Sequence, residues 1–322
     1  MRHRISRWRA ALAEVPTLRE KIGVAGLYVA LRFWSALINV FPVRMNLETA
    51  RLFGLIWWYV KRSHRERAME NLRPALGDRY SEAELLDIAK RSFQHFTQLY
   101  LVELVMTPKL VNAWSWSKYI ELGDLSVPLR QLLSREPTIM LTPHFGNYEL
   151  LGYTIARLGL PLTAIMRPLD NALVNESLEE SRKAGGLTLL HKTGAMEEAN
   201  AVIDRGEPLC FIADQDAGRK GVFAPFFNRQ ASWYKSIAIL ALYKNVTIIV
   251  GGAFRTRQGF HYRIHVERII RPDEWRDQAD PIQWITQNFA ASLENLIRRA
   301  PEQYLWVHRR WKTRPKSELA GK

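Results

Sequence analysis

The chain has 322 residues, of which 47% are apolar, 11% aromatic and 24% charged. This composition excludes an intrinsically disordered chain, because such chains lack the apolar residues that offset the entropy lost on ordering. Lys and Arg (46) outnumber Asp and Glu (32), so the formal net charge is +14. A negatively charged partner is therefore expected, and nucleic acid, anionic lipid and an acidic carrier protein all fit. The single cysteine, Cys210, excludes an internal disulfide framework and a cysteine-based zinc site.

Residues 1–120 are predicted to form a helical, membrane-associated N-terminal part. An apolar stretch from Gly23 to Phe41 follows several early arginines and is interrupted by Arg32. A central arginine costs about 2.5–3.5 kcal/mol on insertion scales, which argues against a plain membrane-spanning helix. A second apolar run, Leu52 to Val60, contains two tryptophans and leads into a basic segment. Such segments are typical of helices that lie in a membrane interface, and a pair of buried helices is the alternative.

The next helix is predicted from a capping-box signature, Ser81 with Glu84, and is expected to end at Pro108. Beyond about residue 121, short apolar runs alternate with amphipathic stretches. This alternation predicts an α/β fold with a mostly parallel central sheet flanked by helices. The α/β core would span 121–322, with a soft boundary near residues 117–123. Strands are expected at Thr138–Thr142, Leu162–Met166, Leu187–Leu190, Pro208–Ala213, Val246–Phe254 and His261–Ile270.

The most informative stretch runs from Thr138 to Glu149 and takes an apolar strand through His144 and Gly146 into a helix. With His144 on the turn and Glu149 in the first helical turns, the carboxylate could fold back onto the imidazole. The carboxylate would then fix one ring nitrogen as a donor and leave the other to remove a proton. The alternative is a helix start that contains a histidine by chance. Because the chain has no Gly-x-Ser-x-Gly elbow, the pair favours direct transfer to an activated hydroxyl.

Two further stretches follow predicted strands and are expected at the same edge of the sheet. The first contains Arg167 and Asp170, and the second contains Asp214 and Asp216. The two aspartates could bind a divalent cation, an arginine or a substrate hydroxyl; no third carboxylate accompanies them, so no metal site is predicted. Arg167 and Arg182 could contact an anionic head group or an oxyanion, although ordinary solvation or a salt bridge is the default for a single arginine.

The segment from Tyr304 to Pro315 mixes aromatic and basic residues. This mixture is compatible with nucleic acid and with a lipid interface. No RNA-recognition signature or zinc-finger spacing accompanies it, so no nucleic-acid partner is predicted.

Together these stretches resemble the late lipid A acyltransferases, the lauroyl and myristoyl transferase family within the His-x4-Asp/Glu glycerolipid acyltransferase superfamily. Five blocks occur in the order of that family. They are His144–Glu149, Arg167–Asn171, Asp214–Gly218, Val222–Phe227 and Glu302–Lys312.

The resemblance implies a membrane-associated enzyme on the cytoplasmic face of the cell inner membrane, with no cofactor. It would move a fatty acyl chain from acyl carrier protein or acyl-CoA to a hydroxyl of a glycolipid such as a lipid A precursor. An anionic membrane surface would be a further partner. His144 would be the general base, Glu149 its partner, Arg182 a substrate-positioning residue and Asp214 a support of the site. The predicted substrate-binding set is Arg167, Asp170, Arg182, Asp214 and Asp216, of which Arg182 lies outside the five blocks.

Three phenylalanines of the fourth block, Phe223, Phe226 and Phe227, could line a slot for the acyl chain or pack in the core. The chain departs from the family pattern at Asn228 and in Ala231–Lys235, where acceptor or acyl chain could bind. The alternatives to acyl transfer onto lipid A are a lipid or thioester hydrolase, acylation of another glycolipid, and a non-catalytic membrane-surface or nucleic-acid-binding module.

Overall fold

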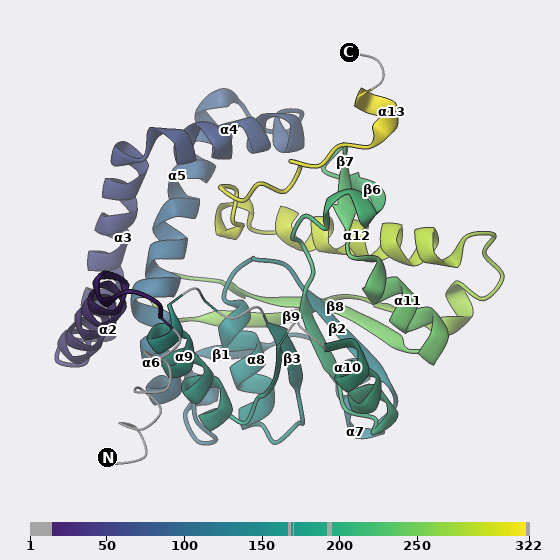
Figure 1. Cartoon of the computed structure of the whole chain (residues 1–322), viewed down its shortest axis with the longest axis horizontal. Helices are drawn as coiled ribbons and strands as arrows, with labels where there is room; N and C mark the ends of the chain where they lie inside the picture. Colours follow the sequence, from purple (N-terminus) through teal and green to yellow (C-terminus); the bar gives the residue numbers. More distant parts are fainter. Residues whose placement is uncertain (1–14, 167–168, 170, 192–194, 320–322) are drawn as a thin grey trace.

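The computed structural model describes residues 15–166, 169, 171–191 and 195–319. The N-terminal part is helical, as predicted, and its helices flank one end of the molecule (Figure 1). They are α2 (Leu18–Ile38), α3 (Val43–Val60), α4 (Arg62–Leu76), α5 (Glu82–Gln98), a π-helical turn (Leu99–Glu103) and α6 (Leu104–Leu110).

Helix α5 begins with the predicted capping box. The Ser81 hydroxyl accepts from the Glu84 N–H, and the Glu84 carboxylate accepts from the Ser81 N–H. The helical path does not end at Pro108, because α6 continues to Leu110.

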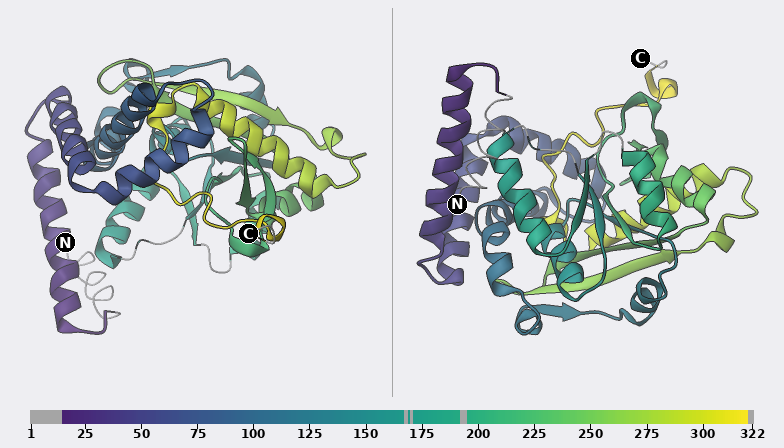
Figure 2. Two further views of the ribbon diagram at one scale, coloured as in Figure 1. Left: turned by 90° about the horizontal axis from the view of Figure 1, so that it is seen from above. Right: turned by 60° about the horizontal axis from the view of Figure 1, so that its bottom comes forward.

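Helix α2 is the one helix within the described ranges that is long and apolar enough to cross a membrane by length and composition. Only 11% of its most apolar window is buried, and Leu18 and Phe33 are 74% and 70% exposed. Figure 2 shows α2 at the edge of the molecule beside α9 (Ala172–Ala184), where the Asn171 side chain donates to the Val24 carbonyl at 3.4 Å. The exposed apolar surface makes α2 a candidate membrane-associated segment.

The predicted mostly parallel sheet is confirmed. In the described part of the chain seven strands form one mixed sheet in the order β1-β9-β8-β2-β5-β3-β4. Strands β8 and β9 are antiparallel neighbours, and the other pairs are parallel. The strands are β1 (Ile120–Leu122), β2 (Thr138–Thr142), β3 (Thr163–Met166), β4 (Thr188–His191), β5 (Leu209–Ile212), β8 (Thr247–Arg255) and β9 (Tyr262–Ile270).

Helices cover both faces of this sheet (Figure 1). Buried side chains of α11 and α12 pack with those of α4 and α5 on one face, and buried side chains of α8 pack with those of α3 on the other. The remaining helices are α7 (Ser126–Leu133), α8 (Tyr148–Arg157), α10 (Ala195–Asp204), α11 (Lys235–Lys244), α12 (Pro281–Arg298) and α13 (Lys316–Leu319), with short 3₁₀ turns at Trp116–Lys118, Gly218–Lys220, Pro272–Glu274 and Pro301–Gln303.

A two-stranded antiparallel hairpin lies outside the main sheet. It consists of β6 (Val222–Phe226) and β7 (Arg229–Trp233) and packs on α12. No strands were predicted for these residues, and the helix that follows, α11, begins at Lys235. The aromatic side chains that suggested a motif are therefore part of a hairpin buried against α12.

Candidate active site

The turn between β2 and α8 holds His144 at the carboxyl edge of the sheet. Gly146 in this turn has φ +56°, and a Cβ there would lie 2.0 Å from the Ala253 carbonyl oxygen, so only glycine fits. The Asn147 side chain accepts from the Leu150 N–H and so caps α8. The turn is also bonded to neighbouring chain segments, since Gly146 N–H donates to the Gln303 carbonyl at 2.9 Å. His144 is thus presented by a backbone that is held on several sides.

The imidazole of His144 is hydrogen-bonded to Asp214. The distance from His144 Nδ1 to Asp214 Oδ1 is 2.7 Å, and Asp214 Oδ2 accepts from the backbone N–H of His144 at 3.0 Å. Asp214 follows β5, the parallel neighbour of β2, which brings both residues to the same sheet edge. The side chains are 11% and 1% exposed, so the pair is shielded from water while the imidazole keeps a small open surface.

Burial and hydrogen bonding oppose each other in this pair. Burial disfavours the charged form of Asp214, but the nearby imidazole and its hydrogen bonds outweigh burial and lower the pKa of Asp214 to about 2. Burial likewise lowers the pKa of His144, and the Asp214 carboxylate outweighs it, so that the pKa of His144 is raised. Asp214 therefore stays ionised and favours a proton on Nδ1, which leaves Nε2 of His144 as the basic nitrogen.

Glu149 was the predicted partner of His144, whereas the carboxylate hydrogen-bonded to the imidazole in the structure is that of Asp214. Glu149 lies in the first turn of α8, but its carboxylate is bound by the guanidinium of Arg182 from α9. Arg182 Nε donates to Glu149 Oε2 at 3.0 Å, and Arg182 Nη2 donates to Glu149 Oε1. The helix directs Glu149 toward α9, whereas Asp214 is delivered to His144 by the adjacent strand. Both side chains of the ion pair are 17% exposed.

The other predicted site residues have different surroundings. Asp216 accepts from the Thr313 hydroxyl at 2.9 Å and from the Gly218 N–H at 3.2 Å, so it ties the C-terminal segment to the loop after β5. It does not share the bond between Asp214 and His144. Arg167 and Asp170 lie outside the described residues.

Two aromatic rings that received no role in the sequence analysis flank His144. The Tyr148 ring meets the imidazole edge to face, with centroids 5.3 Å apart, and the His308 ring is stacked on it at 6.1 Å. Both residues belong to motifs that resemble the family. The position of Tyr148, four residues after His144, was a usable signal because it lies at the start of α8. His308 comes from a distant segment, and no local pattern links it to His144.

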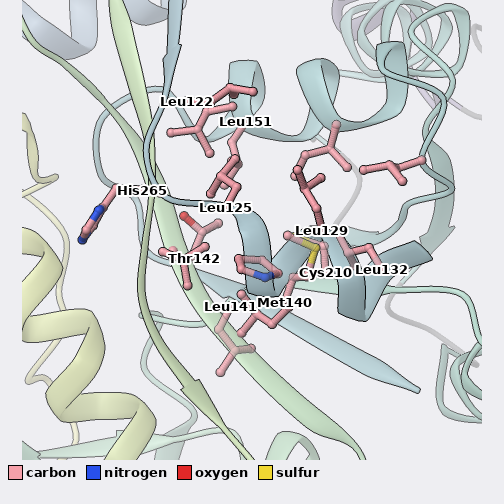
Figure 3. A pocket seen from close by; sticks show the side chains of 18 of the residues that line it. Leu122, Leu125, Leu129, Leu132, Met140, Leu141, Thr142, Leu151, Cys210 and His265 are labelled. Atoms are coloured by element: carbon pink, nitrogen blue, oxygen red, sulfur yellow. The ribbon is translucent and has the colours of Figure 1, made fainter. Parts of the chain in front are cut away.

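An apolar cavity of about 90 Å³ lies on the α8 side of the sheet. Figure 3 shows Leu125 and Leu129 facing it, with Met140, Thr142 and Cys210 contributed by the strands. Thr142 in this wall lies two residues before His144 in the chain. Burial raises the pKa of Cys210 to about 12, which keeps it a neutral thiol in the wall.

The three phenylalanines that were considered for an acyl slot do not line this cavity. Phe226 and Phe227 are fully buried in the core on the α12 side. The Phe226 ring packs edge to face on Trp233, with centroids 5.2 Å apart. Phe226 and Phe227 therefore pack in the core, which was the alternative to lining an acyl slot.

A buried His–Asp pair at the carboxyl edge of a mostly parallel sheet, next to an apolar cavity, defines an α/β protein suited to proton transfer on an apolar substrate. The family described as bacterial lipid A biosynthesis acyltransferase matches residues 17–313. The chain belongs to this family, which confirms the resemblance seen in the sequence, and it is accordingly an acyltransferase.

Three relatives illustrate the relationship. The chain is 29% identical over 218 residues to a lipid A biosynthesis palmitoleoyltransferase of Escherichia coli K12, covering 64% of this chain and 67% of that protein. It is 27% identical over 211 residues to a lauroyltransferase of the same strain, covering 63% and 67%. A lipid A biosynthesis acyltransferase of Haemophilus influenzae is 20% identical over 303 residues, covering 90% and 92%. Family membership supports acyl transfer to a lipid A precursor.

Proposed function

We propose that this enzyme transfers a fatty acyl chain from a thioester donor, acyl carrier protein or acyl-CoA, to a hydroxyl of a lipid A precursor. His144 acts as the general base and Asp214 as the residue that orients and polarises it. The hydrogen bond between His144 Nδ1 and Asp214 is the observation that carries this proposal. The relatives named above are lipid A acyltransferases, which supports the acceptor class.

The step can be written from this geometry. His144 Nε2 takes the proton of the acceptor hydroxyl as its oxygen attacks the thioester carbonyl carbon. The tetrahedral intermediate collapses by breaking the C–S bond, and the thiolate takes the proton from His144. Since the donor is already activated, the enzyme has two tasks: holding donor and acceptor in reach and moving one proton. No covalent acyl-enzyme is needed.

The apolar cavity supports a place for the acyl chain. Its walls are leucines of α7 and α8 together with strand residues, among them Thr142, two residues before His144 in the chain. A chain threaded there from the sheet edge would set its carbonyl carbon near the imidazole. The Glu149–Arg182 ion pair joins α8 to α9 beside this edge, and we assign it to positioning of the substrate. We keep Arg167, Asp170 and Asp216 as predicted substrate contacts. Arg167 and Asp170 lie outside the described residues, and Asp216 binds Thr313 and the Gly218 N–H.

The exposed apolar side chains of α2 and α3 support docking on a membrane, and we propose the cytoplasmic face of the inner membrane as its place. Leu18, Phe33 and Val60 are between 69% and 74% exposed, and Arg32 and Arg44 are exposed among them. Together with the +14 net charge, this surface suits anionic lipid. Docking there would bring a membrane-embedded acceptor to the sheet edge while the acidic carrier protein approaches from the cytoplasm.

The test measures acyl transfer in vesicles that contain the lipid A precursor, with labelled acyl carrier protein or acyl-CoA as donor. His144→Ala should lower transfer by about 10²–10⁴-fold, the usual contribution of a general base, while His261→Ala in the β8–β9 turn should leave it unchanged. Transfer by His144→Ala at the wild-type rate would overturn the assignment. Release of free fatty acid at the same rate with and without acceptor would identify a hydrolase instead.

A further inference from the structure

A hydrogen-bonded pair of tyrosines includes the ring that contacts the imidazole of His144. Tyr148 follows the cap of α8, and Tyr100 lies in the π-helical turn at Leu99–Glu103. Their hydroxyl oxygens are 3.1 Å apart, and the Tyr148 ring contacts His144. Within the described ranges neither hydroxyl is bonded to a third group. Two hydroxyls carry two protons and only one is used between them, so one proton remains free to donate.

The scaffold holds these hydroxyls in place. Besides the Tyr100–Tyr148 bond, a second bond joins the π-helical turn to the turn between β2 and α8. The Asn147 side chain donates to the fully buried Glu103 carboxylate at 2.8 Å. The same carboxylate accepts from the Tyr262 hydroxyl at 2.6 Å and pairs with Arg255. π-helical turns inside α-helices occur frequently at functional sites. Here the turn places one tyrosine at the site and anchors the neighbouring carboxylate behind it.

We propose that the Tyr148 hydroxyl, supported by a hydrogen bond donated from Tyr100, binds the thioester carbonyl oxygen as it becomes an oxyanion. This inference rests on the proposed acyl transfer by His144. As the acceptor oxygen attacks, the carbonyl π electrons move to oxygen, which then accepts the hydrogen bond from Tyr148. When the C–S bond breaks, the electrons return to the carbonyl and the hydrogen bond weakens. Tyr148 keeps its proton throughout.

The electrostatics of Tyr148 agree with a donor role. Burial raises its pKa well above the ordinary value, and the Tyr100 and Glu149 groups raise it further, so the hydroxyl stays protonated across the working pH range. A hydroxyl that itself accepts a hydrogen bond becomes a stronger donor, which is the role of Tyr100. Tyr148 is the donor to substrate because its ring, and not that of Tyr100, contacts His144.

The first test compares Tyr148→Phe with Tyr153→Phe on the same helix α8. Tyr148→Phe should lower kcat by about 10²–10³-fold, the effect of removing one oxyanion donor, with little change in KM. Tyr100→Phe should cost less, about tenfold or below, because it removes only the supporting bond. Tyr153→Phe should leave both constants unchanged. Tyr148→Phe turnover within twofold of wild type would overturn the inference.

A second measurement separates oxyanion binding from a purely structural role. A long-chain trifluoromethyl ketone analogue of the acyl donor adds water to form a tetrahedral hydrate, and transfer of a hydrate proton to His144 gives an oxyanion. The matching methyl ketone stays largely unhydrated and forms no such oxyanion. Tyr148→Phe should weaken inhibition by the trifluoromethyl ketone by roughly the factor lost in kcat/KM and leave inhibition by the methyl ketone unchanged. Equal losses for both ketones would overturn the inference.

The two proposals fail in different ways. If wild type and His144→Ala show the same transfer, the proposed function itself fails. If His144→Ala is inactive while Tyr148→Phe is fully active, only the tyrosine inference fails. The thermal midpoint of each folded variant, followed by circular dichroism, shows whether a loss of activity comes from unfolding.

Discussion

Replacing Asp214 with Asn tests the role of the His144–Asp214 pair most directly. His144 donates two hydrogen bonds to the carboxylate, and an asparagine side chain has only one oxygen to accept them. Asp214 accepts from both Nδ1 and the backbone N–H of His144. An asparagine offers one oxygen, and the backbone N–H cannot become an acceptor, so it keeps that oxygen. The amide N–H₂ then faces Nδ1, which must give up its proton to Nε2. The nitrogen that should act as base is thereby protonated.

The expected fall in kcat for Asp214→Asn is the contribution of the general base, because the substitution leaves the substrate-binding residues in place. General-base help is worth about 10²–10⁴-fold, and the same exchange in a Ser-His-Asp triad lowers kcat by about 10⁴-fold. At 1.36 kcal/mol per factor of ten, Asp214→Asn should cost about 3–5 kcal/mol of transition-state stabilisation. KM for donor and acceptor should change little, because Asp214 is 1% exposed and lies behind the imidazole.

The pH profile supplies the decisive readout. Neutral His144 is the active form, so wild-type kcat/KM should rise with pH through the raised pKa of His144. Without the carboxylate that raises it, this pKa falls and the acidic limb of the residual activity should move to lower pH. Asp216→Asn is the matched control, since Asp216 binds the C-terminal segment and should leave the limb in place. A limb that stays fixed in Asp214→Asn would refute the reasoning.

Three further perturbations follow from the site. Gly146→Ala should lower the free energy of unfolding by about 2 kcal/mol or more in urea titrations, since alanine is strained at φ +56° and its Cβ would meet a carbonyl of β8; an unchanged midpoint would contradict the turn geometry. Glu149→Gln should destabilise the fold and reduce transfer by leaving the Arg182 cation unpaired, and a double-mutant cycle with Arg182→Gln should show a coupling above about 0.5 kcal/mol. Cys210→Phe should shift the preferred acyl donor to shorter chains in a competition assay, because it fills the apolar cavity; an unaltered preference would place the chain elsewhere.

Much of the fold could be predicted because its strands are continuous apolar runs. The strand at Thr138–Thr142 was predicted with its observed limits, since it is buried on both faces and ends at Pro143. The β6–β7 hairpin was missed because Pro225 and a turn of unusual backbone conformation interrupt the pattern. Strand β1 has only three residues, which is too short to show periodicity.

The sequence predicted His144, Glu149 and Asp214 as residues of the candidate site, but which carboxylate pairs with His144 depends on the tertiary structure. His144 belongs to a local strand–turn–helix pattern, and Asp214 was recognised as following a strand. That β5 is the neighbour of β2 is a property of the strand order, which no local pattern carries. Sequence proximity favoured Glu149, five residues from His144, and the strand order favours Asp214, seventy residues away. The Glu149–Arg182 pair depends in the same way on how α9 returns beside α8.

The β6–β7 hairpin changes what the departures from the family pattern mean. Phe227 and Asn228 form its two-residue turn with φ of +49° and +59°, a conformation that asparagine tolerates and in which glycine is otherwise usual. The strained Phe227 is held by its N–H bond to the Glu294 carboxylate at 2.5 Å and by burial of its ring against the Arg298 guanidinium. Asn228 therefore serves a backbone turn on the α12 side, while the cavity proposed for the acyl chain lies on the α8 side. Differences in acyl-chain choice between this enzyme and its relatives should accordingly follow the cavity walls and not residue 228.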